Sequence, residues 1–252
     1  MNTIRRSVWP ALSVAALIAC SVLALIACGA LGGTYNAAAA PAATPASLSQ
    51  RARASTPPFL RQMARALGRV RGYHITVRTN STGDGSPITA TSTEIVLRRG
   101  TTVRVYVTAV TRRAGQVSRT EEVFTGTHLC LRTSARGAWS CRPMLGSALS
   151  GRDPTDAAHL ARAFGPSGRA VPVGRQTRQG QPCTGYRFSL SAGGLRGQGT
   201  LWLARATALP VEEDVVSTLT LFKGAPPLVV RTMQRWSRWN DPHLTIPAVP
   251  AS

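Results

Sequence analysis

The feature that most constrains the fold is a long succession of short segments in which apolar and polar residues alternate. From Tyr73 to Arg78 every second residue is apolar, and Val103, Val105 and Val107 repeat the pattern. A period of two places neighbouring side chains on opposite faces of a strand. Turn-forming pairs that contain glycine separate successive segments. The sequence predicts one strand that begins near residue 73 and others at about 90–98, 101–111, 117–125, 127–133, 138–143, 183–191, 199–205, 211–222 and 227–238.

Two further segments have helical periodicity. From Phe59 to Val70 the apolar residues recur at helical spacing, with arginines on the other side. In the second segment, 153–164, Asp153 is the expected N-cap and Pro154 the first helical residue. A single sheet of about ten strands should curl to bury one face. The prediction is an α+β fold, a curled antiparallel sheet or incomplete β-barrel with two helices covering its concave face.

The N-terminus has the layout of a secretory signal. Met1 to Arg6 is short and basic, and 8–27 is an almost unbroken apolar run. The run ends in Leu25-Ile26-Ala27-Cys28, a lipobox-like tetrapeptide that predicts lipid attachment to Cys28. The same tetrapeptide before Cys20 offers a second site. The run could also remain as an uncleaved transmembrane helix, since about twenty residues can span a bilayer.

These features predict three parts: a lipoprotein signal peptide at 1–27, a flexible tether rich in Ala, Pro and Ser at 28–57, and one domain at 58–252. The domain should lie outside the cytoplasm, anchored to the outer face of the cell membrane by the N-terminal lipid. We expect a monomer.

The chain is strongly basic. It has 30 Lys and Arg residues against 10 Asp and Glu, a formal net charge of +20. Such an excess usually indicates nucleic acid as a partner, but export excludes it here. The arginines are scattered along the sequence, which predicts either a solvated basic face or attraction to anionic lipid head groups.

No group of residues has the spacing of a catalytic or metal site. The four histidines are far apart in the sequence, and no nucleophile or phosphate-binding motif is present. Within Glu121-Glu122 and Glu212-Glu213-Asp214, neighbouring side chains should point to opposite faces of a strand, so we expect solvated partners for arginines. The sequence predicts a protein that is not an enzyme and needs no metal or cofactor.

Three cysteines, Cys130, Cys141 and Cys183, follow the export signal. Disulfides persist outside the cytoplasm. Cys130 and Cys141 flank the turn at Arg136-Gly137, and a hairpin centred there would place them opposite each other. This pair would leave Cys183 without a disulfide partner, so a disulfide from Cys130 or Cys141 to Cys183 remains an alternative.

The C-terminal third carries an ordered set of motifs. They are Gly174, Thr177, Gly180 and Tyr186; then Leu201-Trp202-Leu203; then Thr207-Ala208-Leu209-Pro210-Val211; and finally Arg235-Trp236-Ser237-Arg238-Trp239-Asn240-Asp241-Pro242 followed by Ile246-Pro247. In this order the chain resembles the LolA/LppX-type family of bacterial lipoproteins and lipoprotein carriers over about residues 58–250.

The resemblance implies an incomplete barrel of about eleven strands, with helices over its mouth and an apolar cavity that holds acyl chains. It predicts non-catalytic binding or transport of a lipid or lipidated protein. The alternative is an extracytoplasmic sensor or regulatory protein-interaction domain without a cavity. The candidate lining residues are Phe59, Met63, Leu67, Val103, Val105, Val107, Leu160, Phe164, Leu201 and Leu203, which would also be apolar in an ordinary core.

Overall fold

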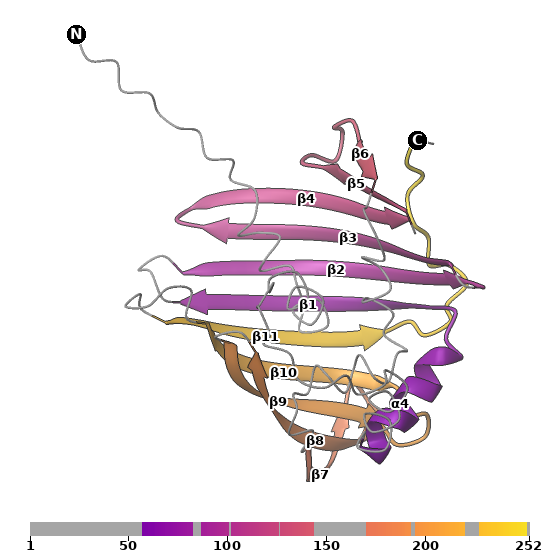
Figure 1. The fold of residues 1–252 in the computed structure, drawn as a ribbon, viewed down its shortest axis with the longest axis vertical. Helices are drawn as coiled ribbons and strands as arrows, with labels where there is room; N and C mark the ends of the chain where they lie inside the picture. The colour runs from indigo at the N-terminus through magenta and orange to yellow at the C-terminus, as the bar shows by residue number, and fades with distance from the viewer. Residues whose placement is uncertain are drawn as a thin grey trace, which may run out of the picture.

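Among the residues that the structure describes, eleven segments form antiparallel strands and one forms a helix (Figure 1). The computed structural model describes residues 57–82, 87–100, 102–125, 127–143, 170–192, 195–219 and 227–250. Its elements are α4 (Pro58–Gly68), β1 (Gly72–Thr82), β2 (Ile88–Arg99), β3 (Thr102–Arg113), β4 (Gln116–Thr125), β5 (His128–Arg132), β6 (Ser140–Pro143), β7 (Val171–Arg178), β8 (Gln181–Ala192), β9 (Leu195–Ala204), β10 (Pro210–Leu219) and β11 (Leu228–Ser237).

All eleven strands belong to one sheet, in the order β6-β5-β4-β3-β2-β1-β11-β10-β9-β8-β7. The first and last strands of the chain, β1 and β11, pair with each other at the centre. The first half of the domain therefore winds outward from β1, and the second half winds back from β7 to the centre.

The predicted α+β fold with two helices over the concave face is wrong. The described residues are nearly all sheet, and they contain one short helix, α4. The edge strands β6 and β7 do not pair with each other, so the sheet is not closed. The predicted helix at 153–164 lies outside the described residues. A helical apolar pattern indicates an amphipathic segment, but it does not determine whether that segment packs on the sheet.

The sequence prediction missed one whole strand, β7. Its residues show no alternation, because most of its side chains are exposed. The pairing with β8 also shifts between Pro172 and Gly174, as at a β-bulge. An edge strand with solvent near both faces needs no apolar side, so it leaves no period of two in the sequence.

We call the face of the sheet that packs against α4 the inner face, and the opposite one the outer face. Every second residue of β1 from Tyr73 to Ser81 points to the inner face and is buried. α4 begins with Pro58 in its first turn, where a missing N–H costs nothing. The main core joins α4 to β1, β2, β8, β9, β10 and β11.

Two glycines let large aromatic rings lie against the sheet. On the inner face, a Cβ on Gly199 of β9 would collide with the ring of Phe188 on β8. On the outer face, a Cβ on Gly185 would collide with the indole of Trp202. In both places an aromatic side chain covers a glycine on the neighbouring strand.

The C-terminal segment is fixed to the start of β1. The Trp239 ring packs against Tyr73 with ring centroids 5.1 Å apart. The backbone N–H of Arg71 donates to Asn240 Oδ1 at 2.6 Å, and the N–H of Asn240 donates to the Gly72 carbonyl at 2.8 Å. The Trp-Asn-Asp-Pro motif thus holds the segment that follows β11 against the start of the central strand β1.

Candidate ligand-binding face

α4 covers part of the inner face. Leu60 is fully buried, and Met63 and Leu67 lie beside it on the same side of the helix. Phe59 stacks on Tyr186 of β8, with ring centroids 4.1 Å apart and planes within 8° of parallel. The apolar side of the helix therefore packs directly on the sheet.

The structure places most of the predicted lining residues together at this contact. Phe59, Met63, Leu67, Leu201 and Leu203 belong to the main core, and Val103 and Val105 are half-buried against it. Val107 is buried as well. Leu160 and Phe164 lie outside the described residues. Contact with a ligand stays a prediction for the whole set.

A row of apolar side chains continues across the inner face to strands that lie beyond the main core. The register joins Tyr73 of β1, Val96 of β2, Val105 of β3, Phe124 of β4 and Leu129 of β5. Tyr73, Val96 and Phe124 are buried, and Val105 and Leu129 are half-buried. With strands about 4.8 Å apart, five of them give a row roughly 19 Å long.

Buried polar side chains lie on the central strands of the same face. Gln234 of β11 is fully buried, and its Nε2 donates to Glu213 Oε2 at 3.0 Å. Burial, followed by the nearby charge of Asp214, raises the pKa of Glu213 from 4.5 to about 8. Glu213 is therefore mainly protonated at neutral pH, and the prediction that it is a solvated partner of an arginine is wrong.

Buried hydroxyl groups also lie on the inner face of the central strands β1, β2, β10 and β11: Thr79, Ser81, Ser92, Ser217 and Thr232. Within the described ranges, Ser81 Oγ and Gln234 Oε1 are buried without a hydrogen-bond partner. None of these residues was predicted from the sequence. Thr79, Ser81 and Ser92 have polar residues on both sides in the sequence, so no alternation of apolar and polar residues marks them as inward-facing.

A second buried carboxylate lies on the outer face. Glu121 Oε2 accepts hydrogen bonds from the Tyr106 hydroxyl at 2.8 Å and from Arg132 Nη2 at 2.6 Å, and Oε1 accepts one from Arg119 at 3.1 Å. Burial alone would raise the pKa of Glu121, but these hydrogen bonds and the two positive charges outweigh it and lower the pKa. The predicted arginine pairing is present, although Glu121 is buried rather than solvated.

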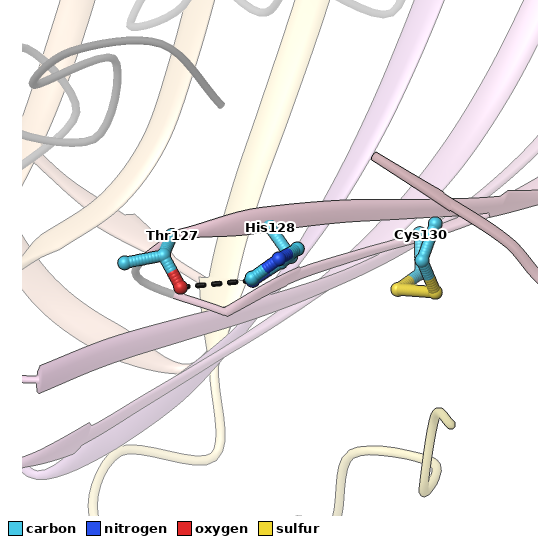
Figure 2. Close-up of a disulfide and its surroundings, with 4 residues drawn as sticks. Thr127, His128 and Cys130 are labelled. Atoms are coloured by element: carbon cyan, nitrogen blue, oxygen red, sulfur yellow. Dashed lines mark hydrogen bonds between the residues drawn. A yellow bond between two sulfur atoms is a disulfide. The ribbon is translucent and has the colours of Figure 1, made fainter. Parts of the chain in front are cut away.

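The disulfide joins Cys130 of β5 to Cys141 of β6, directly across the strand pair (Figure 2). Two residues before Cys130, His128 Nδ1 lies 2.9 Å from Thr127 Oγ1. Cys183 remains a buried free thiol, and burial raises its pKa. The hairpin pairing is thus the one present, and Cys183 is a small apolar core residue.

Trp202, from the Leu-Trp-Leu motif, is buried on the outer face. The Arg178 guanidinium lies over its ring, 4.6 Å from the centroid. Glu212 forms ion pairs with Arg178 at 3.3 Å and with Arg235 at 3.1 Å. Trp236, by contrast, is buried in the main core on the inner face. Trp202 and Trp236 therefore pack on opposite faces of the sheet.

The part of the chain with described positions contains no group of three or more His, Cys, Asp or Glu that could hold a metal ion. In those same residues, no helix is long and apolar enough to cross a membrane.

No protein-family model matches the chain, and no curated protein matches it. Among solved structures, a DUF1329 family protein from Desulfovibrio piger is 12% identical with a TM-score of 0.31, over 74% of this chain and 92% of that one. The MucA/MucB complex of Pseudomonas aeruginosa is 19% identical with a TM-score of 0.35, over 77% and 57%. A putative outer membrane lipoprotein-sorting protein domain from Vibrio parahaemolyticus is 10% identical with a TM-score of 0.24, over 79% and 93%. Membership of the LolA/LppX-type family stays a prediction.

Proposed function

We propose that this chain is an extracytoplasmic, membrane-tethered protein that binds an acyl chain of a lipid or lipidated protein on its inner face, without covalent chemistry. The observation that carries the proposal is the apolar row from Tyr73 to Leu129, which extends the core across β2, β3, β4 and β5.

The dimensions of the row suit an acyl chain. Its length of roughly 19 Å exceeds the depth of one leaflet, which is half of a hydrocarbon core about 30 Å thick. Each methylene that the row shields from water contributes about 0.8 kcal/mol. Tyr73, Val96 and Phe124 are already buried within the protein, so an acyl chain would contact the row chiefly at the half-buried Val105 and Leu129 and would gain affinity from the burial of its own methylenes.

The export part of the proposal rests on the N-terminal sequence and on the disulfide. The pattern that ends at Cys28 favours a lipid anchor, and a Cys130–Cys141 bridge is expected where thiols are oxidised. Replacing Cys28 by Ser should abolish labelling with radioactive palmitate in cells. Unchanged labelling would assign the anchor to Cys20.

The binding proposal is tested by native mass spectrometry of the full chain after extraction in mild detergent. We expect a lipid that is lost on denaturation, whereas a covalent anchor stays with the chain. The variant Val105→Gln combined with Leu129→Gln should lower the bound lipid at least tenfold. Val117→Gln is the matched control, because Val117 is 63% exposed and lies on the outer face of β4.

Circular dichroism of both variants verifies that the fold is retained. Equal lipid occupancy in the parent chain and the double variant would contradict binding at the row. A parent chain that never carries non-covalent lipid would refute the function itself.

A further inference from the structure

Exposed arginines gather on the outer face of the strands that lie opposite α4. The register of β1, β8, β9, β10 and β11 places five of them on this face: Arg78, Arg187, Arg196, Arg231 and Arg235. All five are exposed. These arginines are scattered in the sequence, and they meet on one face only because the strands that carry them are paired.

Carboxylates neutralise only part of this charge. Arg231 forms an ion pair with Asp214 at 2.7 Å, and Arg235 forms one with Glu212 at 3.1 Å. Among the residues with described positions, Arg78, Arg187 and Arg196 form no ion pair. These five arginines and two carboxylates sum to a charge of +3, and Arg178 of β7, which also pairs with Glu212, adds one more positive charge to the face.

Exposed valines lie among the arginines. Val171, Val216 and Val229 are 59%, 46% and 39% exposed. Val171 is paired with Arg187 and Val216 with Arg231, so each pair points to the same side of the sheet. Val229 precedes Arg231 by two residues and shares its face.

We propose that this arginine–valine face docks on the surface of an anionic bilayer. Guanidinium groups donate paired hydrogen bonds to phosphate oxygens, and the valines supply apolar side chains to the interface. From β1 to β8 the arginines spread over roughly 19 Å, which suits many head groups better than one small ligand. Among acidic partners a bilayer fits best, because the N-terminal segment is itself predicted to hold the domain at a membrane.

This inference rests on the proposed membrane tether, but it does not depend on acyl binding at the inner face. A probe at Val216 and a control probe on α4 test it directly, since the two sites lie on opposite sides of the sheet. The full chain carrying Val216→Cys is labelled with bimane and reconstituted into vesicles that contain a lipid-borne nitroxide quencher. Gln62→Cys, at an exposed position of α4, is the control, and the parent chain gives the background label.

In vesicles of phosphatidylcholine with a third of the lipid as phosphatidylglycerol, we expect strong quenching at Val216→Cys and little at Gln62→Cys. Quenching should be lost in pure phosphatidylcholine, and also in 1 M salt, where the Debye length falls to about 3 Å. It should also be lost when Arg78, Arg187 and Arg196 are all replaced by Glu.

Equal quenching at the two sites, or quenching insensitive to salt and to the triple charge reversal, would overturn the proposal. So would quenching that appears only after an acidic protein is added, which would make the face a protein-binding surface. Native lipid occupancy of the inner face is measured separately, so failure of one proposal leaves the other testable.

Discussion

Glu213→Gln should remove a large pH dependence of folding stability. Glu213 is buried on the inner face, where Gln234 provides its hydrogen bond. Burial first, and then the charge of Asp214, raises the pKa of this carboxyl from 4.5 to about 8. The group must therefore stay protonated in the folded protein or ionise in an apolar environment.

The sign of the effect follows from proton binding. Because the pKa of Glu213 is higher in the folded than in the unfolded state, the folded protein binds more protons, and its stability falls as the pH rises. The fall begins near the unfolded value of 4.5 and ends near the folded value of about 8. At about 1.4 kcal/mol for each pH unit, the whole interval corresponds to about 5 kcal/mol.

The assay is guanidinium unfolding of the full chain, followed by circular dichroism at about pH 5 and about pH 9. Glu213→Gln keeps the shape of the side chain but cannot ionise. We expect nearly equal stability of the two proteins at the lower pH and an advantage of several kcal/mol for the variant at the higher pH.

Glu212→Gln is the matched control, since the neighbouring Glu212 pairs with Arg178 and Arg235 on the outer face. This variant retains Glu213 and should retain its contribution to the pH dependence. If Glu213→Gln loses stability with pH as steeply as the parent chain, Glu213 is not the buried neutral acid inferred here.

Three further substitutions test what stabilises the fold. Leu60→Ala removes a fully buried side chain of α4 and should lower the free energy of unfolding by about 2–5 kcal/mol; a loss below that range would show that α4 packs loosely. Glu121→Gln should cost about 2 kcal/mol near pH 7. The pKa of Glu121 is lower in the folded than in the unfolded state. The stability that Glu121 contributes is therefore present above the unfolded pKa of 4.5 and should vanish as the pH falls through the folded pKa. Denaturation of both proteins in acid checks this. Cys141→Ser opens a loop closed across 11 residues and should cost about 3 kcal/mol; equal melting of parent and variant under oxidising conditions would contradict this.

Strands that bury one face and expose the other could be predicted from the sequence. β1 and β3 alternate because one side of each packs in the interior, and that burial leaves a period of two. β7 could not be predicted, because its position at the sheet edge exposes most of its side chains. The pairing of β1 with β11 could not be predicted either, because the alternating pattern of a strand does not show with which other strand it pairs.

The candidate site was only partly predictable, because burial of a polar residue depends on strand pairing as well as on residue type. Leu201 and Leu203 were identified by their apolar character, and the structure places both in the main core. Glu213 and Gln234 were missed because polar residues on a strand are normally assigned to solvent. Their burial depends on register, which pairs them with each other across β10 and β11.

The arginine–valine face and the inner face lie on opposite sides of the sheet, and this arrangement predicts from which side the protein receives its ligand. If the arginine–valine face lies on the bilayer, the inner face points away from that membrane, so an acyl chain must arrive from the opposite side. Full chain in anionic vesicles should therefore take a fluorescent acyl lipid faster from a soluble acylated donor than from its own bilayer. Replacing Arg78, Arg187 and Arg196 by Glu should free the domain to turn on its tether and remove that preference. If the parent chain takes up lipid equally fast from both sources, the protein does not bind its ligand at the inner face while its arginine–valine face lies on the bilayer.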